Sequence, residues 1–63
     1  MQVQYFTQSG KLYREEIKSD NNAQTVQNEL SEKIVSQSRI SVVTEFGTVF
    51  LDTKDIARVC VVD

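Results

Sequence analysis

The residues of this chain that could carry out covalent catalysis reduce to one cysteine, Cys60. A cysteine nucleophile needs a neighbouring base, most often a histidine, and the chain contains no histidine. Cys60 also lies inside the apolar run Ile56–Val62, where a small thiol packs like a hydrophobic side chain. We therefore expect Cys60 to be a buried structural residue rather than a reactive one.

Neighbouring carboxylates are the other residues whose spacing suggests chemistry, because two of them can divide the roles of acid and base. Glu15 and Glu16 are adjacent in a predicted strand, so their side chains point to opposite faces of the sheet. Asp52 and Asp55 flank a short polar break, where an aspartate normally bonds its own backbone in a turn. The sequence therefore predicts no catalytic residues and a protein that is not an enzyme.

The residue patterns that hold cofactors and metals are missing as well. A phosphate-binding loop needs several neighbouring glycines, whereas Gly10 and Gly47 are the only two and stand alone in separate predicted turns. A structural zinc ion takes four cysteine or histidine ligands, and this chain offers one cysteine and no histidine. We expect neither a cofactor nor a metal site.

Arginine and aromatic residues are the remaining candidates for contacts with a ligand or partner. Arg58 is notable because it interrupts an apolar strand; an ion pair within the structure is the favoured explanation, and an anionic ligand between subunits is the alternative. Aromatic and basic residues of the first hairpin are suited to single-stranded nucleic acid, although a hairpin that packs on a helix uses aromatics in the same way. The candidate contact residues are Tyr5, Tyr13, Arg14, Arg39 and Arg58.

The charge balance disfavours nucleic acid as a partner, and the sequence shows neither a membrane span nor a signal peptide. The net charge is −2, and the basic residues are scattered rather than clustered as phosphate binding requires. No stretch approaches the ~18 apolar residues of a membrane span, and the first residues lack the pattern of a signal peptide. A single thiol suits a reducing compartment. We expect a cytoplasmic protein that does not enter the membrane.

Two strands joined by a tight turn are predicted at the start of the chain. Residues 2–7 alternate polar and apolar side chains, which is typical of a strand with one buried face. In the following turn Gly10 can adopt the positive φ that a tight hairpin needs. Residues 12–18 form the returning strand, with Tyr13 and Ile17 on one face.

An amphipathic helix is predicted for residues 22–36. A cluster of helix N-cap residues, 19–22, comes immediately before it. The apolar positions then recur at intervals of three and four residues, which indicates one buried stripe: Ala23, Val26, Leu30 and Ile34. Because this stripe is about as wide as contact with one sheet requires, we expect the helix to pack on the sheet of its own chain.

Three apolar runs near the end of the chain predict a three-stranded meander, and the last run also suggests self-association. The run Ile56–Val62 is apolar at nearly every position, which indicates a strand covered on both faces. A chain of 63 residues has a marginal core and little else to cover a second face. The predicted strands are residues 40–45, 48–52 and 56–62. The residues expected at the subunit interface are Val43, Val49, Phe50, Leu51, Val59, Val61 and Val62.

Together these elements predict a single domain, residues 1–63, of the α+β class. Its order is β-β-α-β-β-β, with an antiparallel sheet and one amphipathic helix packed on it, assembled as a homodimer or a higher closed oligomer. The segment GTVFLDTKDIARVCVV, with a strand, a polar break and a D-I-x-x-V strand, resembles part of the Sm-like and other small bacterial barrels. In the Sm-like order the helix precedes all strands, whereas here a hairpin comes first, so the resemblance carries no family membership and no functional residues.

The leading functional prediction is a non-enzymatic regulator that acts as a homo-oligomer and binds another macromolecule, a protein in the first place. An inhibitor or an adaptor fits this description, and the richness in Gln, Asn and Ser is similar to that of small phage and prophage proteins. One alternative is a protein that binds or sequesters a small ligand at sites between subunits. The second alternative is binding of single-stranded nucleic acid by the N-terminal hairpin.

Overall fold

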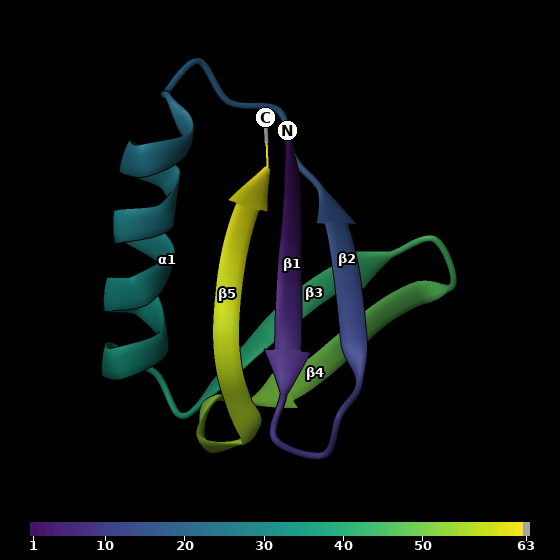
Figure 1. The fold of residues 1–63 in the computed structure, drawn as a ribbon. Helices are drawn as coiled ribbons and strands as arrows, with labels where there is room; N and C mark the ends of the chain where they lie inside the picture. Colours follow the sequence, from purple (N-terminus) through teal and green to yellow (C-terminus); the bar gives the residue numbers. More distant parts are fainter. Residues whose placement is uncertain (63) are drawn as a thin grey trace.

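The computed structural model describes residues 1–62, which form five strands and one α-helix in the order β-β-α-β-β-β (Figure 1). The predicted α+β class is therefore confirmed. The helix α1 spans Ala23–Ser36, and a single 3₁₀ turn, η1 (Thr53–Asp55), joins the last two strands. The strands are β1 (Gln2–Thr7), β2 (Leu12–Glu16), β3 (Arg39–Thr44), β4 (Gly47–Asp52) and β5 (Ile56–Val62).

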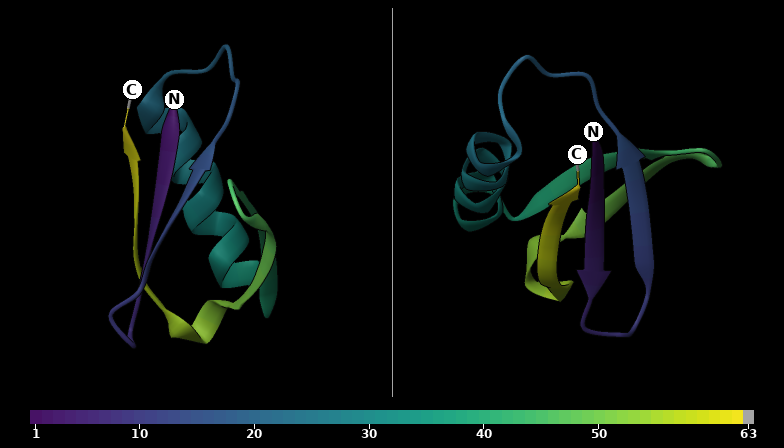
Figure 2. Two further views of the ribbon diagram at one scale, coloured as in Figure 1. Left: turned by 90° about the vertical axis from the view of Figure 1, so that its right-hand side faces the viewer. Right: turned by 45° about the horizontal axis from the view of Figure 1, so that its top comes forward.

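The strands are divided between two antiparallel sheets that face each other (Figure 2). One sheet has the order β2-β1-β5, so that β1 lies in the middle, and the other is the β3–β4 hairpin. The register places Gln2 beside Glu16 of β2 and beside Val62 of β5. Because side chains alternate along a strand, Val3 and Tyr5 point toward the hairpin, while Gln4 and its even-numbered neighbours point outward.

The prediction of a C-terminal three-stranded meander is wrong. The β3–β4 hairpin forms as expected, but β5 pairs with β1 rather than with β4. The 3₁₀ turn η1 redirects the chain between β4 and β5. In its final position β5 supplies hydrogen-bond partners to the side of β1 that β2 leaves open, which satisfies buried backbone groups of the central strand.

The hydrophobic core lies between the two sheets and draws on both of them. Val3 and Tyr5 come from the middle of the larger sheet, and Ile40, Val42 and Leu51 come from the hairpin; all five are buried. Burial of each such side chain contributes about 1.5–3 kcal/mol. Half-buried apolar residues of α1, β2, β4 and β5 pack around this cluster. The buried centre of the core thus comes from alternate positions of β1, β3 and β4.

The helix begins and ends close to the predicted residues and lies beside β5 (Figure 1). Asn22 is the N-cap, and its side-chain oxygen accepts a hydrogen bond of 2.8 Å from the Thr25 N–H, which satisfies one of the free donors of the first turn. Val26 of the apolar stripe is buried, and Leu30 and Ile34 pack against the core. The predicted packing of the helix on its own sheet is confirmed.

Gln27 of α1 closes the outer edge of β5. Its Nε2 donates to the Val59 carbonyl at 2.7 Å, and its Oε1 accepts from the Val61 N–H at 3.0 Å. The side-chain amide thus makes the two hydrogen bonds that a neighbouring strand would make at this place. An unpaired strand edge invites pairing with another chain, so Gln27 protects β5 from such pairing.

Replacement of Gln27 by alanine is expected to lower the free energy of unfolding by about 1–2 kcal/mol, because two backbone groups of β5 lose their partners. Urea unfolding followed by circular dichroism measures the change. Gln24→Ala is the matched control, since Gln24 lies on the same helix and bonds only the exposed Asn28. The control is expected to change the unfolding free energy by less than about 0.5 kcal/mol. Equal losses in the two variants would show that the bonds to β5 contribute nothing.

The prediction that β5 is covered on both faces does not hold within one chain. Val59 and Val61 pack against the core on the inner face, whereas Arg58 and Val62 on the outer face are exposed. Cys60, also on the outer face, is half-buried rather than buried. The alternation of the sheet decides this outcome, because odd and even positions of β5 point to opposite sides. Self-association stays a prediction.

Candidate functional site

The carboxylate of Glu15 joins the two sheets. Its Oε1 accepts a hydrogen bond of 3.1 Å from the Tyr5 hydroxyl, and its Oε2 accepts one of 2.9 Å from the Val43 N–H. Burial, followed by the neighbouring Glu15 charge and hydrogen bond, raises the pKa of Tyr5 well above its usual range. Glu16 is exposed on the opposite face, as the alternation predicted.

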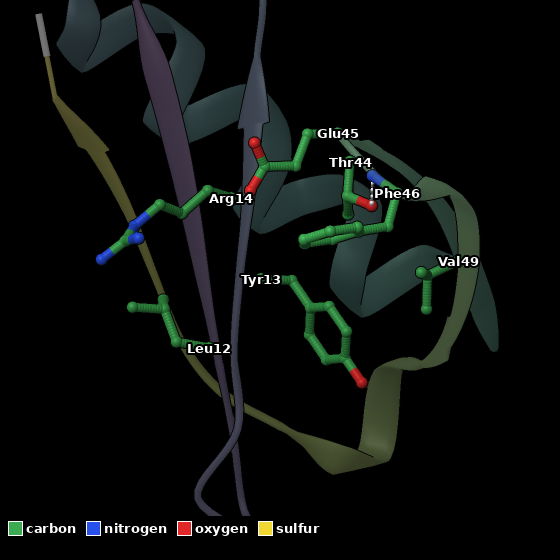
Figure 3. Close-up of a pocket in the computed structure, with 7 residues that line it drawn as sticks. All are labelled: Leu12, Tyr13, Arg14, Thr44, Glu45, Phe46 and Val49. Carbon is green, nitrogen blue, oxygen red and sulfur yellow. Dashed lines mark hydrogen bonds between the residues drawn. The ribbon is translucent and has the colours of Figure 1, made fainter.

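A hollow of about 320 Å³ lies between β2 and the tip of the β3–β4 hairpin. We name it the hairpin hollow. The walls of the hollow are β2 and the hairpin. The hydrogen bond from the Val43 N–H to Glu15 positions them, because it fixes β3 beside β2. Figure 3 shows the ring of Phe46 and the ring of Tyr13 reaching into this space from opposite elements. The lining residues are Leu12, Tyr13, Arg14, Thr44, Glu45, Phe46 and Val49.

Phe46 is the most exposed large apolar side chain of the described residues, at 92%. It occupies the turn between β3 and β4, where no core is within reach. The turn itself is well fixed: the Phe46 N–H donates to Oγ1 of Thr44 at 3.2 Å, and this hydroxyl donates to the Gly47 carbonyl at 2.8 Å. Gly47 has a φ of 120°, a conformation that side chains disfavour. An ordered backbone therefore holds an aromatic ring in solvent at the rim of the hollow.

The edge of β2 offers backbone hydrogen-bonding groups on the side away from β1. The Thr7 N–H donates to the Lys11 carbonyl, and the Ile17 N–H donates to the Met1 carbonyl. Since bonded and non-bonded pairs alternate in an antiparallel ladder, Tyr13 and Glu15 also bond β1. The N–H and C=O groups of Leu12 and Arg14 then point away from β1. The hollow thus combines an apolar floor with the polar edge of a strand.

The rim of the hollow carries charges of both signs. Arg14 and Glu45 are both exposed, one on β2 and the other in the hairpin turn. Figure 3 shows the Arg14 side chain pointing away from the hollow and the Glu45 side chain reaching toward β2. Tyr13 and Val49 form that floor and are half-buried. An apolar centre with a charged rim is the usual composition of a protein-binding surface.

The structure disperses the five residues predicted to contact a ligand or partner. Tyr13 and Arg14 line the hairpin hollow, whereas Tyr5 is buried in the core, with 2% of its surface exposed. Arg39 lies beside Asp52 on the outer face of the β3–β4 hairpin. Arg58 stacks over the ring of its cross-strand neighbour Phe6, with 4.3 Å between the guanidinium carbon and the ring centre.

The residues predicted at a subunit interface fall into three groups. Leu51 is buried in the core of the chain itself. Val49, Val59 and Val61 are half-buried and pack against that core. The members that the chain leaves exposed are Val43, Phe50 and Val62. Whether these residues contact another subunit stays a prediction.

Phe46 is not among the contact residues predicted from the sequence. A usable signal was present in the sequence. A large aromatic residue directly before a turn glycine lies where the chain reverses, and such a position is at the surface. Leu12 is likewise absent from the predicted contact residues, although it is partly exposed and lines the hollow.

Among residues 1–62 no group of His, Cys, Asp or Glu side chains is placed to hold a metal ion. The one helix in this part of the chain is too short and too polar to cross a membrane. Comparisons of the chain with models of protein families, with curated proteins and with solved structures give no match. The hairpin hollow is therefore the feature from which a function is to be argued.

Proposed function

We propose that this protein is a non-enzymatic interaction protein that binds an extended segment of another protein in the hairpin hollow. In this role it acts as an adaptor or an inhibitor and works as a homo-oligomer. The observation that carries the proposal is the ring of Phe46, held in solvent by a hydrogen-bonded turn. The ring lies outside the hydrophobic core of the chain, and aromatic rings are typical anchors of protein interfaces.

The proposed binding mode combines an apolar anchor with strand addition. An apolar side chain of the partner packs between Phe46, Tyr13 and Val49, which line the hollow. The backbone of the same segment pairs with the outward groups of Leu12 and Arg14 on β2. Peptide recognition by strand addition draws affinity from backbone hydrogen bonds and specificity from side-chain pockets.

A protein partner has more support than the two alternatives. The arginines that a small anionic ligand would need lie on different strands: Arg14 on β2, Arg39 on β3 and Arg58 on β5. Arg58 is already stacked on Phe6. Tyr5, one of the aromatics suggested for stacking on nucleic acid, is buried. The net charge of −2 further disfavours a polyanionic partner.

The proposal is tested by site-specific photo-crosslinking in source cells, with p-benzoylphenylalanine in place of Phe46. Placement of the same group at Val35 is the matched control, because Val35 is 88% exposed on α1, far from the hollow in sequence and element. We expect one protein to be cross-linked from position 46 and not from position 35. Phe46→Ser should then weaken binding of that purified protein at least about tenfold, as loss of an interface anchor does, whereas Val35→Ser should not.

Two results would contradict the proposal. One is cross-linking from position 46 only to other copies of this chain. The other is a partner whose affinity is the same for the wild-type protein and Phe46→Ser. Circular dichroism of each variant verifies that the fold is kept, which we expect because both side chains are exposed.

A further inference from the structure

One edge of β4 is left without a strand in the described part of the chain. The Thr53 N–H donates to the Ser38 carbonyl at 3.0 Å, so that pair belongs to the bonded set of the β3–β4 ladder. Because bonded pairs alternate, Val49 and Leu51 bond β3, whereas Thr48 and Phe50 direct their N–H and C=O groups away from it. No strand within residues 1–62 pairs with that side of β4.

Two other strand edges in residues 1–62 receive hydrogen bonds from side chains: Gln27 bonds the edge of β5, and Glu15 accepts from the Val43 N–H at the edge of β3. The open edge of β2 is the one assigned above to the partner segment. Proteins protect a strand edge from pairing with proline, lysine or a β-bulge. The strand β4 contains neither proline nor lysine, and its register with β3 is unbroken from Gly47 to Asp52. The open edge of β4 therefore lacks these protections.

Apolar side chains accompany this open edge on the outer face of the hairpin. Phe50 is 66% exposed and Val43 is 59% exposed. Phe50 lies opposite Ser41 and Val43 lies opposite Thr48, so the two apolar side chains are diagonal neighbours on adjacent strands, within reach of each other. An exposed apolar patch next to unpaired backbone groups marks a surface that is covered in the working form of the protein.

We propose that two copies of this chain pair through β4, antiparallel and about a twofold axis at Phe50. The two hairpins then form one four-stranded sheet with the order β3-β4-β4-β3. This proposal rests on the self-association that is part of the proposed function, and it names the surface that carries it. The order of residue types along β4 argues for a second copy rather than an unrelated strand.

The order of polar and apolar residues along β4 is symmetric about Phe50. Thr48 and Asp52 are polar, Val49 and Leu51 are apolar, and the aromatic Phe50 stands between them. An antiparallel copy centred on Phe50 therefore meets β4 with polar opposite polar and apolar opposite apolar, as an isologous interface requires. No like charges are brought opposite each other by this pairing.

Each pair of residues that lie opposite each other in the proposed interface makes a definite contact. The N–H of Phe50 in each copy donates to the Phe50 carbonyl of the other, and the two rings lie side by side on the outer face. The Thr48 hydroxyl donates to the Asp52 carboxylate of the second copy. Val49 and Leu51 of the two copies meet on the inner face, where they extend the apolar surface between the sheets.

The proposal is tested with Phe50→Lys, which places two like charges opposite each other at the axis. Native mass spectrometry and sedimentation equilibrium are expected to show a dimer for the wild-type protein and a folded monomer for Phe50→Lys. Val35→Lys is the matched control, since it puts the same charge at another exposed valine, and it should remain dimeric. A wild-type monomer, or a dimer that persists in Phe50→Lys, would overturn the proposal.

Amide hydrogen exchange locates the interface independently of any substitution. The Phe50 N–H should become at least about tenfold more protected as the protein concentration is raised through the dimerisation range. The Val43 N–H, which Glu15 already bonds, should not change. A dimer in which the Phe50 N–H still exchanges freely, or protection that requires a different protein, would refute the pairing of two copies. Phe46→Ser should remain dimeric. The proposal of partner binding at the hairpin hollow and the proposal of pairing at the β4 edge can therefore fail independently.

Discussion

Replacement of Tyr5 by alanine is expected to remove a large part of the free energy of unfolding at 25 °C. Removal of a buried aromatic ring from a core costs about 3–5 kcal/mol, and Tyr5 lies in the middle of the core that both sheets share. A chain of this length has a total stability of about 3–9 kcal/mol. The loss is therefore a large part of the whole. The cavity would open beside Val3 and Val42, which are themselves completely buried.

Far-ultraviolet circular dichroism and urea unfolding measure this loss of stability. Two further variants serve as comparisons. Tyr5→Phe keeps the ring and removes only the hydroxyl that donates to Glu15, so we expect a loss of about 1 kcal/mol. Phe46→Ala removes a ring of similar size from solvent and should change stability by less than about 0.5 kcal/mol. A Tyr5→Ala variant as stable as Phe46→Ala would contradict the position of the core.

Replacement of Glu15 by alanine is expected to lower the free energy of unfolding by about 1.5–3 kcal/mol, the range for hydrogen bonds to a charged group. The substitution removes the acceptors of both the Tyr5 hydroxyl and the Val43 N–H. The variant Glu15→Gln keeps one acceptor oxygen and should lose about half as much. Glu16→Ala is the control, because the exposed Glu16 makes only a surface ion pair of 3.5 Å and such pairs contribute little.

Alkaline pH provides a second measurement of the same contact. The pKa of Tyr5 is raised in the folded protein by burial and by Glu15, so above pH about 10 the unfolded chain loses this proton while the folded chain retains it. Stability should therefore fall as the pH rises above that value. In Glu15→Gln the charge is gone, so the pKa of Tyr5 in the folded protein should be raised less and stability should stop falling at a lower pH. A fall over the same pH range in both proteins would show that Glu15 does not influence Tyr5.

The order and type of the elements could be predicted from the sequence because each has a local signature. Alternation of side chains marks residues 2–7 as a strand, and Asn22 before an apolar stripe marks the start of the helix. The partner of β5 has no such signature. An apolar strand such as Ile56–Val62 pairs equally well with any neighbour whose edge is free, so its position beside β1 depends on the tertiary arrangement.

The candidate site was predictable only in part, because it too depends on the tertiary arrangement. Tyr13 and Arg14 were recognised by type, but the hairpin hollow exists because β2 and the turn at Phe46 meet, and they are distant in the sequence. The bonds that hold the site together were not foreseeable either. The sequence predicted only that Glu15 and Glu16 point to opposite faces, and the contact of Glu15 with the Val43 N–H depends on the position of β3 beside β2.

The pairing of the first strand with the last has a consequence for how the protein folds. Tyr5 reaches its neighbour Val59 only after most of the chain has been looped out, and each doubling of such a loop costs about 0.6 kcal/mol of entropy. Domains dominated by distant contacts fold more slowly than those built from local ones. During synthesis β1 has β2 beside it early, but the strand that completes the sheet is made after the other four. The central strand therefore remains open on one side until Ile56–Val62 is available.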